Sequence, residues 1–366
     1  MESFKDSIYN NFDQNPQKAK LYSHKFLKIA RKLNDNKEES NAYYLLAELC
    51  GTISQKDSAI FYFKKAIDKA SAINNQELVL NYKINKASYL FTEYDFNGAL
   101  LLYDECLKLA KKNGNKKAYD YITNKRGNVY YEIGKYNEAL AIFKKSLRNK
   151  DFEALTLLGI QLSITKTFLK LNQPDSALVY SKKSISEAKN LKLEEFEMHF
   201  YHEEGLIYTY KKKYEIAEKS FDKALFLAQK DDFFEMKRLI LISKSKLFSL
   251  QKQSDKAILL LKEIVSNKNN IPISVENRVV IDSLLADNYK AMNKLALSNF
   301  HYQKCNEGQR KLNSKKIDAI DQLHKIDLLE VKDESDNQTK LKWIFTLIAI
   351  LSVIGLIIIY IKKIKS

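Results

Sequence analysis

The chain has 366 residues, of which 45% are hydrophobic and 29% charged, so it can bury a core and is not disordered by composition. Only 9 Gly and 3 Pro occur, and this scarcity of turn-forming residues indicates long helices joined by short connections. The net charge of +16 comes almost entirely from Lys that is scattered along the chain, which fits solvated helix faces and excludes an obvious nucleic-acid site.

The N-terminus begins MESFKDSIYNNFDQ, which has no apolar stretch and therefore does not predict a secretory signal. Downstream, a helix-start pattern recurs about every 40 residues. One small residue recurs at the same place in each copy of the pattern: Ala59, Ala99, Ala139, Ala177, Ala217 and Ala257. The steps between them are 40, 40, 38, 40 and 40 residues, and Ala19 and Ser298 extend the series at either end.

Each unit of this pattern predicts a pair of helices. Apolar or small residues four and seven positions after the repeated alanine share one helix face. A second buried-type residue lies nine positions before the alanine and often follows a small residue by three positions, which indicates a preceding helix. Pro16, Pro174 and Pro272 lie where a helix would begin, the position that proline tolerates.

The spacing small-x2-aromatic-x8-Ala-x3-aromatic-x2-Ala resembles the tetratricopeptide repeat (TPR). The best copies are KRGNVYYEIGKYNEALAIFKKS (125–146) and HEEGLIYTYKKKYEIAEKSFDKAL (202–225). Two features depart from the family: the period is 40 rather than 34, and the only Trp is Trp343. The resemblance covers about residues 5–312 and implies an all-α, TPR-type α-solenoid, which we assign to residues 1–312.

The resemblance also implies a concave groove, lined by the first helix of each unit, that binds an extended peptide or a helix of a partner protein. Asn side chains there would hydrogen-bond a peptide backbone, and Lys would hold a carboxylate. The full carboxylate clamp of the family is not reproduced, and the same residues fit ordinary solvated surface. The groove candidates are Asn81, Asn85, Tyr121, Asn124, Lys125, Asn128, Tyr131, Lys166, His199 and His202.

No motif in the sequence predicts catalysis or a cofactor. GxGxxG, the P-loop, HExxH and GxSxG are all missing, so we expect a protein that is not an enzyme. In EMHFYHEE the two histidines are three residues apart without an evident third ligand, so no metal site is expected. The cysteines Cys50, Cys106 and Cys305 fall on packing positions of the repeat.

The last part of the sequence predicts a membrane anchor. Residues 313–342 are expected to form a helical extension and a linker, with an apolar seam that includes Ile317, Ile320 and Leu323. Residues 343–361 contain no charge, and at about 1.5 Å per residue a helix of this length matches the ~30 Å hydrocarbon core. We therefore predict one transmembrane helix, followed by a short basic tail over 362–366.

Two functions fit this organisation. The first is a membrane-anchored TPR scaffold or adaptor that binds a protein or peptide, does not contact nucleic acid directly, and, as the sequence reads, is tail-anchored with cytoplasmic repeats. The second follows from a resemblance to the TPR sensor half of bacterial membrane-bound transcription regulators or histidine kinases. In that case this chain is a signal-input module, and its signal peptide and effector domain are not in the sequence.

Overall fold

The computed structural model describes residues 2–12, 15–149, 151–230, 233–266, 273–323 and 325–326, and within these ranges it contains helices and no strands. A long final helix over residues 295–323, still helical at 325–326, is called the C-terminal helix below. The helices before it are α1 (Glu2–Asn11), α2 (Pro16–Lys32), α3 (Asn36–Thr52), α4 (Lys56–Ala72), α5 (Gln76–Thr92), α6 (Phe96–Lys112), α7 (Lys116–Glu132), α8 (Tyr136–Ser146), α9 (Ala154–Lys170), α10 (Pro174–Asn190), α11 (Glu194–Tyr210), α12 (Tyr214–Lys230), α13 (Phe234–Leu250), α14 (Ser254–Val265) and α15 (Val275–Ala291).

The 40-residue period of the sequence is two copies of a 20-residue module. Most helices have 17 residues and are followed by a three-residue turn whose middle residue has a positive φ. In the first such turn Asn34 has φ 53°, and the backbone N–H of Asp35 donates to the carbonyl of Ala30 at 3.0 Å, which satisfies a free carbonyl of α2. Asp35 then caps α3 by accepting from the N–H of Glu38 at 3.0 Å.

The turns explain why so few glycines are needed. Asn, Ser, Lys and Tyr residues adopt the left-handed backbone conformation in turns such as those at Ser54, Tyr94 and Lys192. Pro16 and Pro174 occupy the first residues of α2 and α10, as the sequence predicts, while Pro272 lies outside the described residues. The module therefore ends most of these helices by local backbone geometry, and the chain reverses at each such turn.

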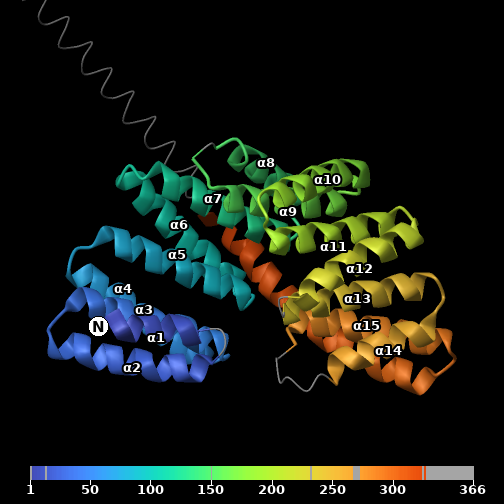
Figure 1. Ribbon diagram of the computed structural model, residues 1–366, viewed down its shortest axis with the longest axis horizontal. Helices are drawn as coiled ribbons and strands as arrows, with labels where there is room; N and C mark the ends of the chain where they lie inside the picture. Colours follow the sequence, from blue (N-terminus) through green and yellow to red (C-terminus); the bar gives the residue numbers. More distant parts are fainter. Residues whose placement is uncertain are drawn as a thin grey trace, which may run out of the picture.

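Successive helices pack as antiparallel pairs, and the odd-numbered helices carry the inner surface (Figure 1). Close approach within two pairs depends on glycine: a Cβ on Gly127 would lie 2.7 Å from the Phe143 ring, and one on Gly205 would lie 2.5 Å from the Phe221 ring. Phe143 and Phe221 are fully buried, as the repeat pattern predicts. The expectation of an all-α, TPR-type solenoid is confirmed.

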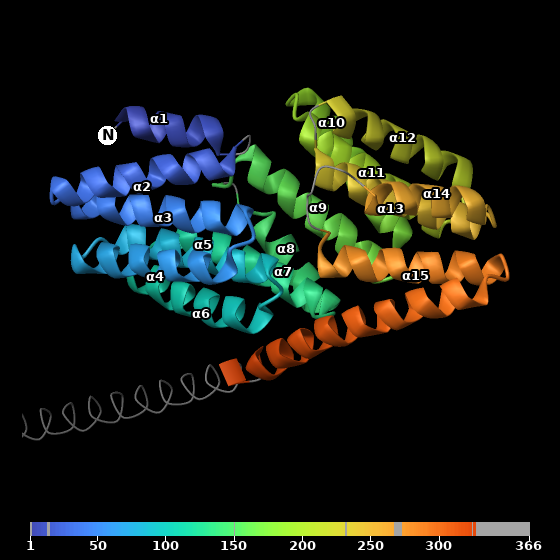
Figure 2. The same ribbon diagram turned by 90° about the horizontal axis from the view of Figure 1, so that it is seen from below.

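The C-terminal helix leaves α15 and runs back beneath the solenoid to the edge of α6 and α7 (Figure 2). Its Ala319, Leu323 and Ile326 are buried in the same core cluster as residues of α5, α6 and α7. Ile317, which the sequence places on the same apolar seam, is 59% exposed. The solenoid is thus closed into a ring-like arrangement by its own last helix.

Among the helices of the described ranges, none is both long and apolar enough to cross a membrane. The segment 343–361, which the sequence predicts to be a transmembrane helix, lies outside the described residues, as does the tail over 362–366.

Candidate functional site

A cavity of about 720 Å³ opens on the inner side of the solenoid, and we call it the central cavity. Its walls come from the second halves of α7, α9 and α11, from α13, from the start of α15 and from the C-terminal helix. Leu206, Leu239, Ile242 and Val280 supply apolar surface, and Tyr131 lies beside them. An apolar cavity with a few convergent polar groups is the usual form of a ligand site.

The central cavity has an excess of positive charge. Five lysines line it against three glutamates, which is an excess of two positive charges when all are ionised: Lys166, Lys170, Lys212, Lys246 and Lys316, and Glu132, Glu203 and Glu276. Lys170, Lys212 and Lys246 are exposed to solvent and form no ion pair with any described residue. Exposed ammonium groups at the wall of a cavity favour an anionic ligand group such as a carboxylate.

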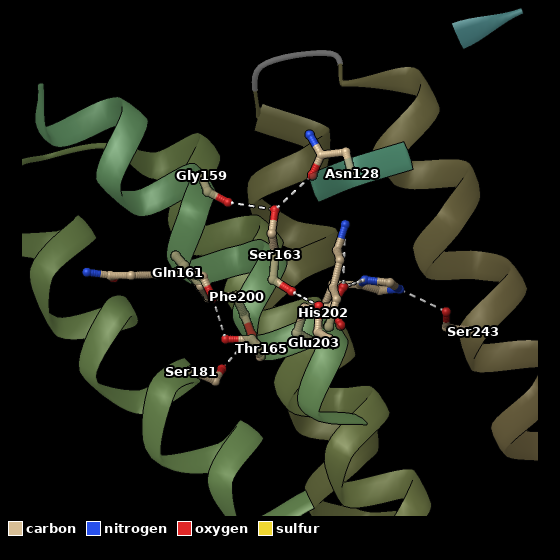
Figure 3. A network of polar contacts seen from close by, with 12 residues as sticks. Asn128, Gly159, Gln161, Ser163, Thr165, Ser181, Phe200, His202, Glu203 and Ser243 are labelled. Atoms are coloured by element: carbon tan, nitrogen blue, oxygen red, sulfur yellow. Dashed lines mark hydrogen bonds and ion pairs between the residues drawn. The ribbon is translucent and has the colours of Figure 1, made fainter. Parts of the chain in front are cut away.

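His202 and Glu203 form the most buried polar group of the cavity, and Figure 3 shows His202 pointing between Glu203 and Ser243. One ring nitrogen of His202 lies 2.8 Å from Ser243 Oγ on α13, and the other lies 3.5 Å from Glu203 Oε1. Burial alone would raise the pKa of Glu203, but the hydrogen bond from His202 and the charge of Lys166, 3.9 Å away, together lower this pKa. Glu203 is therefore ionised, and the nearby ammonium of Lys166 compensates its negative charge.

A second acidic group lies where the start of α15 comes close to the turn after α5 and to the end of α7. Burial, together with the charge of Glu276, raises the pKa of Glu132, while Lys316 and Lys170 act against the increase. Glu276 accepts a hydrogen bond from the hydroxyl of Tyr94 at 3.2 Å. Burial and the charge of Glu276 also raise the pKa of Tyr94 to about 12, so this phenol stays a donor at neutral pH.

A smaller cavity of about 480 Å³ lies at the beginning of α7 and α9, and we call it the entry cavity. Asn81 and Asn85 of α5 and Tyr121 of α7 line it, together with Lys117 and Phe152. Three of the residues predicted from sequence thus meet at the entry cavity, whereas Tyr131, Lys166 and His202 meet at the central cavity.

The remaining predicted residues line neither cavity. Asn124 is only 9% exposed, and its Oδ1 has no hydrogen-bond partner within the described part of the chain. Asn128 accepts a hydrogen bond from Ser163 at 3.5 Å, and Lys125 lies 5.1 Å from the centre of the Tyr121 ring. Burial, with the nearby Lys166, lowers the pKa of His199 to about 4, so its ring is neutral at physiological pH.

Several cavity residues were not predicted from the sequence. Lys170 and Glu132 lie at the ends of their helices, past the groove positions taken from the TPR pattern. Glu276 and Lys316 reach the cavity only because the last helices return to the first half of the solenoid. The spacing of the repeats does not predict that the last helices pack against the first half of the solenoid. Within the residues that the structure describes, no group of three or more His, Cys, Asp or Glu side chains is placed to hold a metal ion.

The tetratricopeptide repeat family matches residues 40–68, 124–151 and 199–231, and each match falls on one helix pair, starting inside its first helix. A search of curated proteins finds no relative. Among solved structures, the chain is similar to the apo form of the quorum sensor NprR from B. thuringiensis, with a TM-score of 0.61, 15% identity, and coverage of 84% of this chain and 86% of that chain.

It is also similar to aspartyl phosphate phosphatase F from Bacillus subtilis, with a TM-score of 0.59, 14% identity, and coverage of 77% of this chain and 74% of that chain. A third similar structure is NprR in complex with its cognate peptide NprX, with a TM-score of 0.53, 19% identity, and coverage of 69% of this chain and 71% of that chain. At these identities the likeness establishes the fold alone. The chain is an all-α, TPR-like solenoid.

Proposed function

We propose that this protein is a non-catalytic adaptor whose central cavity binds a peptide, or an extended segment of a partner protein, that carries a carboxylate. The observation that supports this most is a set of exposed lysines, Lys170, Lys212 and Lys246, that form no ion pair within the described residues and line a cavity of about 720 Å³ with apolar walls. A cavity of this volume lies in the range of small-ligand sites, and tyrosine and leucine surface beside ammonium groups suits a short peptide. The peptide in the NprR–NprX structure supports the same ligand class.

The test is capture of a random-sequence heptapeptide pool with free termini by the full chain. We expect Lys170→Met with Lys246→Met to reduce capture about tenfold, because a hydrogen bond to a charged group contributes about 1.5–3 kcal/mol. The matched control is Lys182→Met with Lys183→Met, two exposed lysines of α10 that do not line the cavity. Equal capture by the two double variants would contradict the assignment of the central cavity.

We further propose that residues 343–361 anchor the adaptor in a membrane as a single pass, on the evidence of nineteen uncharged residues with Trp343 and Tyr360 near the ends. Deleting 343–361 is expected to move the protein from the membrane fraction to the supernatant in carbonate-washed membranes. A full chain that remains in the supernatant would refute the anchor and leave the peptide-binding proposal intact. Protease accessibility of the repeats in intact cells would report their side of the membrane, which decides between adaptor and sensor input.

A further inference from the structure

We propose that the C-terminal helix is a ligand-coupled strap, which completes the central cavity and docks more firmly on α5–α7 when a ligand fills that cavity. This inference rests on the proposed peptide binding. It goes beyond that proposal because it gives the cavity a way to act on the chain that follows the C-terminal helix.

The two halves of the C-terminal helix have different partners. The first half is the second helix of the last repeat: Ser298 Oγ donates to the Ala286 carbonyl at 2.9 Å, and His301 Nδ1 lies 2.7 Å from Asp282 Oδ1 on α15. The second half leaves α15 and contributes Leu323 and Ile326 to the core cluster of α5–α7. The first half is therefore fixed to its own repeat, and the second half is a docked extension.

The docked half is held at the turn between α5 and α6. Lys315 Nζ donates to the backbone carbonyl of Glu93 at 2.7 Å and lies 5.6 Å from the centre of the Tyr94 ring. Tyr94 has φ 59°, a left-handed conformation that is costly for a residue with a large side chain. From this position its hydroxyl also reaches Glu276 of α15 at 3.2 Å. One turn residue thus contacts both the strap and the wall of the cavity.

The strap itself forms part of the cavity. Lys316, next to Lys315, lines the central cavity together with Glu132 and Glu276, and its charge acts on the carboxyl of Glu132. If the second half of the helix leaves α5–α7, Lys316 no longer lines the cavity. Lys315 then also no longer lies beside Tyr94, whose hydroxyl contacts Glu276. A ligand that binds the closed cavity better than the open one must, by linkage, stabilise the docked strap to the same extent.

The experiment uses the full chain with Leu323→Glu, which places a carboxylate in the buried cluster, and the control Ile317→Glu, which changes an exposed residue of the same helix. Without peptide, hydrogen exchange should rise in α5–α7 of Leu323→Glu only. With the heptapeptide pool, capture by Leu323→Glu should fall about tenfold, within the range of measured coupling between linked sites. In the unmodified chain, captured peptide should slow exchange over residues 313–323.

A milder variant guards against a general loss of folding. Lys315→Met removes the contact with Glu93 and Tyr94 without placing a charge in the core, and Lys325→Met, at an exposed lysine of the same helix, is its control. Capture that is equal in Leu323→Glu, Lys315→Met and their controls would overturn the coupling while leaving peptide binding in place. Unchanged exchange in Leu323→Glu would overturn the docking itself. A full chain that captures no peptide would remove the proposed function, and the coupling with it.

Discussion

Replacing Gly205 with alanine is expected to destabilise the solenoid by about 1–3 kcal/mol, the usual cost of overpacking a close-packed core. The new Cβ would lie 2.5 Å from the ring of Phe221. Phe221 is fully buried between α11 and α12 and cannot rotate away without disturbing its neighbours in the core cluster. The loss exceeds the gain of about 1 kcal/mol that alanine normally brings to a helix interior.

The chain offers a matched control in Gly159, which lies inside α9, where a Cβ would have no atom within 4 Å apart from its chain neighbours and its own helix backbone. Gly159→Ala is expected to stabilise the protein by up to about 1 kcal/mol through helix propensity alone. Urea unfolding followed by circular dichroism, with hydrogen exchange to locate the affected helices, would measure both. The same sign of change for the two variants would show that the Gly205–Phe221 contact does not set the spacing of α11 and α12.

A still larger loss, about 3–5 kcal/mol, is expected when Arg278→Met and His301→Leu are combined, because they leave a buried carboxylate without its partners. Asp282 is 1% exposed, and it accepts from Arg278 Nε at 2.9 Å and lies 2.7 Å from His301 Nδ1. This group joins α15 to the start of the C-terminal helix. The double variant should therefore also release the strap from its own repeat.

A third substitution distinguishes charge burial from lost packing. Adding Asp282→Leu to the double variant removes the unpaired carboxylate, so most of the lost free energy of unfolding at pH 7 should return. His24→Leu with Arg310→Met, which alters the same residue types at exposed positions, is expected to change little. A triple variant that is no more stable than the double one would show that packing, rather than the buried charge, holds α15 to the last helix.

The sequence predicted the repeating part of the fold with its phase. The steps between the repeated alanines give the start of each second helix, and the shortened step of 38 residues coincides with the short α8 and its connection to α9. This is possible because helix pairing in a solenoid depends on residues close in sequence: a small residue such as Gly205 and the aromatic ring that packs on it belong to one unit.

The sequence located the site only in part. Tyr131, Lys166 and His202 lie in the central cavity, because the inner face of each first helix follows from its register within the repeat. Asn124 shows the limit of this reasoning, since it occupies a predicted groove position but its side chain is buried and does not line either cavity. Whether a groove position is open depends on how closely the adjacent units approach, which the pattern within one unit does not specify.

The sequence by itself determined that the chain is all-helical, where most of its helices begin, and which residues fill the space between paired helices. Only the tertiary structure decided that the solenoid closes on itself and that Lys316 and Glu276 join Glu132 in one cavity. The decisive contacts join residues far apart in the chain, 182 positions for Tyr94–Glu276 and 222 for Lys315–Glu93. Small rotations between successive units add up over the whole array to bring these residues together, and no periodic pattern of local residues encodes that sum.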